Sequence, residues 1–138
     1  MKKPDPVPGM VVRYDFLWDK EARRGRIEGR KDRPCAIVVV AAETGHVVLV
    51  PVTHTPPASG TGIELPQRVK AHLGLDDERS WVVLTDLNRV LWDDAGIVPA
   101  TRARWDYGAL PQPLLIEIQQ GIAKLARQQR LAVVNRRS

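Results

Sequence analysis

The sequence predicts an α+β protein, mainly β, in which a small curled antiparallel sheet or barrel packs against a C-terminal helix. Two observations lead to this prediction. Apolar, β-branched runs of strand length recur through the chain, and the best segment with helical periodicity lies near its end. No strand–helix–strand unit of the kind that builds a parallel sheet is evident. The 138 residues are close to the globular average in composition and are expected to form a single domain, 1–138.

The strands follow from apolar patterning. After an extended, Pro-rich stretch at 1–9, residues 10–17 alternate apolar and charged side chains, which predicts a half-buried strand. Residues 35–42 and 47–52 are continuous β-branched runs separated by four turn residues, which predicts a hairpin in the middle of the sheet. Shorter or later strands are predicted at 63–65, 81–90 and 131–134, and the last residues, 135–138, are expected to form a short basic tail.

The helices follow from spacing and end signals. Residues 67–73 carry apolar side chains one turn apart and end at Gly74, a residue that suits a left-handed helix end, so a short inserted helix is predicted. Residues 112–129 carry apolar side chains three and four apart and basic residues at the end, which predicts the C-terminal helix. In residues 18–33 cations outnumber acids and apolar periodicity is lost, which predicts a mobile basic loop.

Net charge and cysteine content indicate the kind of partner and the cellular compartment to expect. The formal net charge of +5 favours an acidic partner, with nucleic acid first. Cys35 is the single cysteine, so no internal disulfide framework is possible and a reducing cytoplasm is expected. Prolines occupy the place where a signal peptide would need an apolar segment. The longest apolar run, 36–42, is far shorter than the roughly 20 residues of a membrane span. We therefore expect no membrane association.

Common catalytic motifs are missing from the sequence. It contains no glycine-rich phosphate loop ending in Gly-Lys-Ser or Gly-Lys-Thr and no Gly-x-Ser-x-Gly. His46, His54 and His72 do not have the spacing of a zinc motif. Nucleotide triphosphate hydrolysis, serine-hydrolase chemistry and metal chemistry are therefore disfavoured, and neither a cofactor nor a metal is expected.

An ordered set of motifs carries a resemblance to a known family. Glu28 lies five residues before the Arg33-Pro34 pair, which opens a Val/Ile run. The run Val48-Leu49-Val50-Pro51-Val52 then ends in Thr53, and Leu84-Thr85-Asp86-Leu87-Asn88-Arg89 follows later. In this order the motifs, together with the terminal helix, resemble the PemK/MazF family of toxin endoribonucleases over nearly the whole chain.

This resemblance implies an SH3-like barrel that forms a homodimer, cleaves single-stranded RNA at short sequences without a metal, and is restrained by a cognate antitoxin protein. The arginine of the Arg-Pro pair and the threonine at the strand end are the central catalytic pair of the family, which correspond to Arg33 and Thr53 here. The chain also departs from the pattern. Met10 stands where an acidic residue is usual, and Ile27 and Leu84 stand where some relatives have histidine and arginine.

The chemistry can be argued from the residues as well. Metal-free cleavage can use the ribose 2′-OH as nucleophile, and it then needs a base, a cation at the phosphorane and an acid for the 5′-oxygen. The guanidinium of Arg33 suits the cation, and the hydroxyl of Thr53 can donate to the phosphate. Glu28 or Asp86 can orient Arg33 or act as the base. The expected products end in a 2′,3′-cyclic phosphate and a 5′-OH.

RNA contacts are predicted for Trp18, Arg23, Arg24, Arg26, Arg30, Lys31 and His54. Structural alternatives stay open for each type of residue. The arginine at 33 can be a solvated side chain at the start of a strand, the threonine at 53 an ordinary strand end, the aspartate at 86 a structural carboxylate, and the basic cluster a solvated loop. Accordingly, a second hypothesis remains beside the nuclease: a non-catalytic SH3-like module that binds RNA or a protein.

Overall fold

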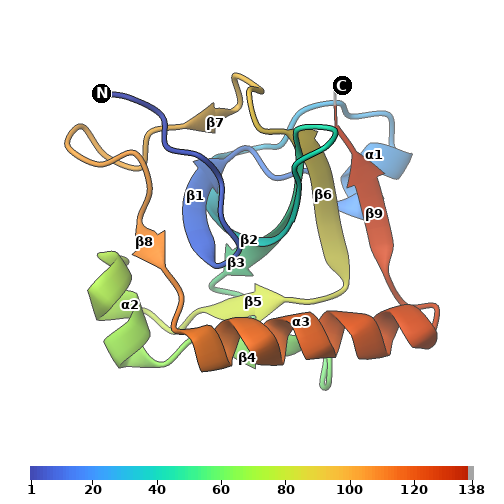
Figure 1. Cartoon of the computed structure of the whole chain (residues 1–138). Helices are drawn as coiled ribbons and strands as arrows, with labels where there is room; N and C mark the ends of the chain where they lie inside the picture. Colours follow the sequence, from blue (N-terminus) through green and yellow to red (C-terminus); the bar gives the residue numbers. More distant parts are fainter. Residues whose placement is uncertain (137–138) are drawn as a thin grey trace.

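The computed structural model describes residues 1–136, which form one branched, mainly antiparallel sheet and three helices (Figure 1). In chain order the elements are β1 (Met10–Tyr14), α1 (Asp19–Arg23), β2 (Arg33–Ala41), β3 (His46–Thr53), β4 (Gly62–Glu64), α2 (Gln67–Leu73), β5 (Trp81–Val83), β6 (Asp86–Leu91), β7 (Ile97–Val98), β8 (Gly108–Ala109), α3 (Gln112–Arg127) and β9 (Ala132–Asn135). The α+β class predicted from the sequence is confirmed.

The sheet branches at β3. This strand pairs with β2 along one edge, while its other edge pairs with β6 near its start and with β5 at its end. The main path runs β4-β5-β3-β2-β1-β7, and β9 joins the free edge of β6 in parallel. The curled antiparallel sheet is therefore confirmed, with one parallel pair that the sequence did not predict. Within residues 1–136 the sheet does not close into a barrel.

Apolar side chains are buried on both faces of the central strands. On β1, Val11 belongs to the core beneath α2 and α3, whereas Val12 belongs to a second core on the opposite face. Residues of β2 alternate in the same way, with Ile37 in one core and Val38 in the other. This two-sided burial explains the continuous apolar runs of the hairpin. It also corrects the prediction of a half-buried first strand, because Arg13 is the exposed residue of β1.

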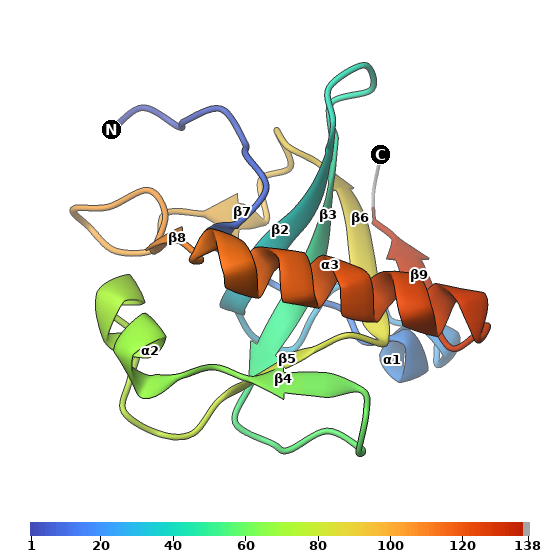
Figure 2. The same cartoon turned by 60° about the horizontal axis from the view of Figure 1, so that its bottom comes forward.

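The C-terminal helix lies across the sheet (Figure 2). Its buried side chains, Leu115, Ile118 and Leu125, follow the spacing that predicted the helix. The side-chain amide of Gln119 donates to the carbonyl of Val38, at 3.0 Å, where the pairing of β2 with β3 is irregular. Both predicted helices are therefore confirmed, the shorter one with the predicted residues 67–73 and with Gly74 in the left-handed conformation at φ 71°.

Two strands replace the single strand predicted at 81–90. The chain leaves β5 after Val83, and the backbone N–H of Leu84 turns to the carbonyl of Thr61 at 2.8 Å. It then begins β6 at Asp86 and pairs with the other end of β3. The carbonyl of Thr85 accepts the N–H of Ala132 at 2.8 Å, which brings β9 to the same place. Apolar and polar residues keep alternating through this corner, so the sequence pattern did not reveal the break between β5 and β6.

The segment predicted as a mobile loop at 18–33 contains α1 and is packed against the sheet. A Cβ at Gly29 would lie 2.4 Å from the carbonyl oxygens of Asp15 and Phe16, so this position needs glycine for the close approach. The carbonyl of Ile27 accepts a hydrogen bond from Arg136 at 3.4 Å. Arg136, expected in a basic tail, is instead buried, and residues 137–138 of that tail lie outside the described residues.

The Pro-rich start of the chain is held by aromatic side chains. The ammonium of Lys3 lies 4.4 Å from the ring centre of Trp92 and 5.2 Å from that of Trp105, and Trp92 Nε1 donates to the carbonyl of Pro4.

Cys35 is fully buried, and this burial raises the pKa of its thiol, so the thiol stays protonated. None of the helices in residues 1–136 has the length and apolar character needed to cross a membrane.

Candidate active site

The pairing of β2 with β3 brings the two predicted catalytic residues together. Cys35 lies opposite Pro51 in the last pair of the register at this end of the hairpin, and Arg33 and Thr53 each lie two residues beyond that pair, towards the same end. Arg33 is the first residue of β2 and Thr53 the last of β3. Both side chains therefore stand at the end of the hairpin, where the strands open towards the basic segment and the loop after β3.

Two cavities meet at this strand end. The smaller, of about 280 Å³, is bordered by Arg33, Thr53 and Thr55 and extends towards His54 and Asp76. The larger, of about 850 Å³, is bordered by the same three residues and extends towards α1 and β6. The Arg33 and Thr53 side chains thus form part of a wall that the two cavities share.

Unused hydrogen-bonding capacity remains on both side chains of this wall. Arg33 is half-buried, its guanidinium carbon lies 5.2 Å from the ring centre of Trp18, and Nη1 lies 3.4 Å from the carbonyl oxygen of Val52. Its Nε is buried, so the donors that a substrate in the cavities can meet are those of the terminal nitrogens Nη1 and Nη2. The hydroxyl oxygen of Thr53 accepts the N–H of Thr55 at 3.2 Å, which leaves the hydroxyl hydrogen free to donate. This arrangement suits an anion that accepts from both.

Of the two carboxylates predicted to orient Arg33 or act as the base, Asp86 and Glu28, only Asp86 borders a cavity. Asp86 borders the larger cavity, but its Oδ2 accepts the backbone N–H of Asp19 at 3.0 Å and its Oδ1 lies 3.3 Å from the hydroxyl of Thr85. It therefore anchors the start of α1. Glu28 is exposed and borders neither cavity. The structure does not bring Glu28 to the site.

Glu21 is a site residue that the sequence did not reveal. It is 5 % exposed, borders the larger cavity and accepts a hydrogen bond from Arg30 Nε at 2.7 Å. Its other oxygen lies 3.4 Å from the backbone nitrogen of Trp18. It lies in the mostly charged stretch Asp19-Lys20-Glu21-Ala22-Arg23, so nothing in the pattern distinguished it from a solvated side chain. Through these two contacts Glu21 links Arg30 to Trp18, the residue whose ring lies over the guanidinium of Arg33.

The five basic residues of this segment that were predicted to contact RNA divide into three groups. Two of them are neutralised locally, because Arg23 pairs with Asp19 at 2.9 Å and Arg30 pairs with Glu21. Arg24 borders the larger cavity and Lys31 the smaller one, so their charges face the site. Arg26 is exposed and borders neither. Trp18, the remaining predicted RNA contact of the segment, borders the larger cavity.

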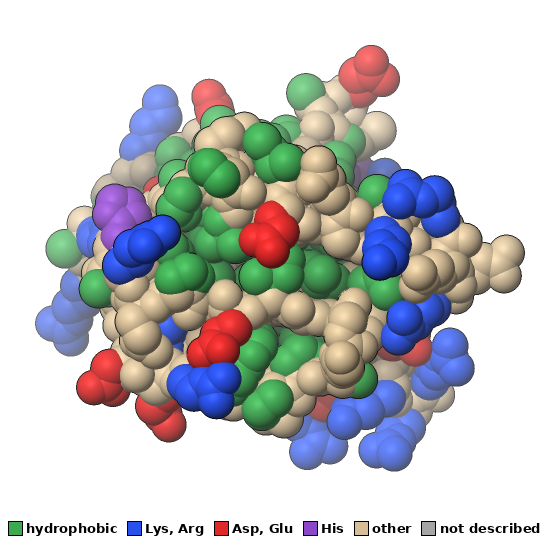
Figure 3. Space-filling view, turned by 90° about the horizontal axis from the view of Figure 1, so that it is seen from below, with side chains coloured by type: hydrophobic (Ala, Val, Ile, Leu, Met, Phe, Trp, Pro, Cys, Tyr) green, Lys and Arg blue, Asp and Glu red, His purple; other side chains and the backbone are tan. Residues whose placement is uncertain are grey.

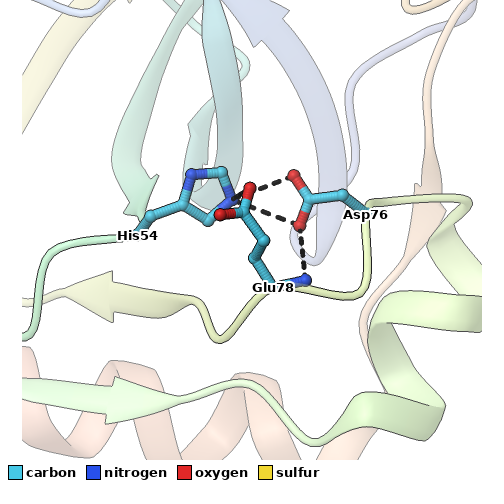
Figure 4. Close-up of side chains that lie close together, drawn as sticks. All are labelled: His54, Asp76 and Glu78. Carbon is cyan, nitrogen blue, oxygen red and sulfur yellow. Dashed lines mark hydrogen bonds and ion pairs between the residues drawn. The ribbon is translucent and has the colours of Figure 1, made fainter.

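His54 lies in a cluster with two acids from the loop after α2 (Figure 4). Its Nε2 is 2.9 Å from Oδ2 of Asp76 and 3.8 Å from a carboxylate oxygen of Glu78. The buried ammonium of Lys70 binds Asp76 Oδ1 at 2.8 Å and also donates to the backbone carbonyl of Glu78. This Lys70 hydrogen bond is the main reason that the pKa of Asp76 is lowered from its ordinary value.

A histidine and two carboxylates also form a possible set of metal ligands, and the ligand atoms of the three residues lie within 4.8 Å of one another. The ammonium of Lys70, however, already occupies one oxygen of Asp76 and places a positive charge beside the cluster. The positive charge of Lys70 would repel a metal cation bound at this cluster. The arrangement fits a histidine whose ring is oriented by an aspartate better than it fits a metal site.

Comparison with known proteins shows that the fold is similar to that of a solved structure. No protein-family model matches the sequence, and no curated protein matches it. Among solved structures, the chain is similar to a chain of the MazE-MazF complex (Form-III) from Deinococcus radiodurans, with a TM-score of 0.58 and 22 % sequence identity. The match covers 90 % of this chain and 98 % of that chain. The chain therefore has a MazF-like α+β fold.

Proposed function

We propose that the protein is the toxin of a toxin–antitoxin system, a sequence-specific endoribonuclease that cleaves single-stranded RNA in the cytoplasm without a metal. One observation carries the proposal: Arg33 and Thr53 both border the two cavities at the end of the β2–β3 hairpin, where the guanidinium and the hydroxyl can donate to one substrate phosphate. The MazF-like fold supports it, because the solved neighbour is a complex of MazE with MazF.

The two cavities suit a chain that crosses the wall between them. A scissile phosphate above Arg33 and Thr53 would have one neighbouring nucleotide on the side of each cavity. The planar guanidinium can donate to the phosphate oxygens, and its stabilisation grows as negative charge develops on the phosphorane. The hydroxyl of Thr53 adds a neutral donor. Attack by the ribose 2′-OH then gives a 2′,3′-cyclic phosphate and releases the 5′-oxygen as 5′-OH.

The outer face of α3 is proposed as apolar contact surface for a second copy of the chain or for an antitoxin. Ile116 on this helix is 42 % exposed, and Val39 on β2 is 50 % exposed. Hydrophobic side chains gather over the middle of the face seen from below, with some acidic side chains among them, and Lys and Arg side chains lie at both ends, most of them at one end (Figure 3). Apolar area with a charged border is typical of protein-binding surfaces.

The proposal is tested by incubating the purified protein with a mixed RNA pool in EDTA and analysing the ends of the products. We expect cleavage at a short recurrent sequence, with 2′,3′-cyclic phosphate and 5′-OH ends detected by mass spectrometry. Products with only 5′-phosphate ends would exclude 2′-OH attack. Binding of RNA without any cleavage would leave the non-catalytic binding module as the function.

The charges that face the cavities predict how RNA binding depends on salt. Replacing Arg24 and Lys31 together by Ala should make the slope of log K against log salt shallower by about 0.7 for each phosphate that the protein no longer neutralises. Fluorescence anisotropy with an oligonucleotide of the cleaved sequence, methylated at its 2′-hydroxyls, measures the slope without cleavage. Arg102→Ala is the matched control, because Arg102 is exposed and borders neither cavity. An equal change for each charge removed in the control would mean that net charge alone sets the slope.

A further inference from the structure

The proposed reaction needs a proton acceptor for the 2′-OH, and the carboxylates named from the sequence do not supply one. Glu28 is outside both cavities, and the oxygens of Asp86 are engaged by α1 and Thr85. Glu21 is held by Arg30. Asp19 and Asp32, which border the larger and the smaller cavity, are paired with Arg23 and Arg13. The imidazole of His54 carries a lone pair suited to proton transfer, and it borders the smaller cavity together with Arg33 and Thr53.

We propose that His54 is the general base of this site and that Asp76 is its positioning residue. The inference rests on the proposed function and names the group that starts the reaction. The adjacency of His54 to Thr53 in the chain places the imidazole at the strand end that carries the catalytic pair. Its side chain is about half exposed, so a substrate can reach it.

The hydrogen bond to Asp76 decides which ring nitrogen is the base. An ionised carboxylate only accepts, so its contact with Nε2 at 2.9 Å fixes the proton of the neutral ring on Nε2. The lone pair is then on Nδ1, and Figure 4 shows this nitrogen on the side of the ring that faces away from the two acids. Lys70 keeps Asp76 in place and charged through its own contact at 2.8 Å. An imidazole oriented by a carboxylate in this way is a recurrent arrangement of general bases.

The reaction can be written with all atoms accounted for. Nδ1 of His54 takes the proton of the 2′-OH, the 2′-oxygen forms a bond to phosphorus, and the bond from phosphorus to the 5′-oxygen breaks. The 5′-oxygen takes a proton from water, and the imidazolium returns its proton to the hydroxide that remains. Arg33 and Thr53 hold the phosphate throughout.

The charged groups around His54 bear on its pH dependence. They come from the start of β2 and the residues before it, from α2 and from the loop after α2: Lys31, Asp32, Arg33, Lys70, Asp76 and Glu78. Only a ring with a free lone pair on Nδ1 can accept the proton of the 2′-OH, so a dependence of the cleavage rate on pH that comes from this base should disappear when residue 54 is replaced.

The test compares wild-type protein, His54→Gln and His72→Gln in single-turnover cleavage of RNA in EDTA across a range of pH. His72 is the matched control, because it is an exposed histidine on α2 that borders neither cavity. We expect His54→Gln to lower the rate by about 10²-fold or more, to flatten the pH profile, and to leave the affinity for the 2′-methylated oligonucleotide unchanged. His72→Gln should cleave like the wild type.

A substrate with sulfur in place of the bridging 5′-oxygen separates a base from an acid, because a thiolate leaves without a proton. The defect of His54→Gln should persist on this substrate, and its disappearance would show that His54 is an acid instead. Asp76→Asn should lower the rate and move the pH profile, while Glu78→Gln should have a smaller effect.

The outcomes separate this inference from the proposed function. A wild-type protein that does not cleave RNA overturns both. Wild-type cleavage combined with an unchanged rate and profile in His54→Gln overturns the base alone. A loss of affinity equal to the loss of rate would show that His54 only binds RNA. Wild-type cleavage that occurs without EDTA but is abolished by EDTA would show that the reaction needs a metal, and it would overturn both the metal-free reaction and the base.

Discussion

Replacing Arg33 by Ala is expected to lower the rate constant for RNA cleavage by about 10²–10³-fold, the effect of removing one preorganised donor from a site of this kind. The guanidinium is held by Trp18 and the carbonyl of Val52, so it is already aimed at the cavity wall when substrate arrives. Its removal takes away the cation that balances the phosphorane while the hydroxyl of Thr53 stays in place. Single-turnover kinetics on the cleaved oligonucleotide in EDTA measure the effect.

Two further variants show whether the arrangement of donors or only their charge matters. Arg33→Lys keeps a positive charge but loses the planar fork, so we expect only partial recovery of the rate. Arg102→Ala removes an exposed arginine away from the cavities and should cleave normally. In cells, induction of the wild-type gene should arrest growth and Arg33→Ala should relieve the arrest. Equal toxicity of the two, with equal folding by thermal melting, would contradict a catalytic role for Arg33.

Replacing Arg136 by Met is expected to destabilise the protein by about 3–5 kcal/mol, the usual effect of breaking a buried charge pair. The side chain of Arg136 is 1 % exposed, and its guanidinium lies 3.2 Å from a carboxylate oxygen of Asp15 and 3.0 Å from the side-chain oxygen of Asn88. It also donates to the carbonyl of Asp15 at 2.8 Å and lies over the ring of Tyr14 at 4.8 Å. The variant leaves these buried polar groups without the guanidinium.

The position of this network explains the size of the effect. Asn88 pairs its side-chain amide with both backbone groups of Leu17, so the network joins β6 and the end of β9 to the chain that follows β1. Urea denaturation measures the free energy of unfolding, with Arg102→Met as the exposed control. A loss below about 1 kcal/mol would show that the network contributes little beyond packing.

The secondary structure was predictable where local pattern and tertiary demand coincide. The hairpin of β2 and β3, the short helix ended by Gly74 and the long helix at the C-terminus all followed from apolar spacing and end signals. Sequence pattern failed at the corner between β5 and β6, because an alternating strand gives no sign of where it changes partner. It also missed the burial of Arg136, because a basic residue near a terminus resembles a solvated tail.

In the candidate site, too, some features follow from local sequence pattern and others depend on tertiary packing. The sequence by itself predicted the β2–β3 hairpin, and Arg33 and Thr53, which were named from the family resemblance, lie at one end of it, where β2 begins and β3 ends. Only the tertiary structure decided which ionisable groups join them. It excluded Glu28 and brought Asp76 to His54, 22 residues apart in the chain. The physical reason is that strand register is fixed by local hydrogen bonding, whereas the meeting of two loops depends on how the elements that carry them pack.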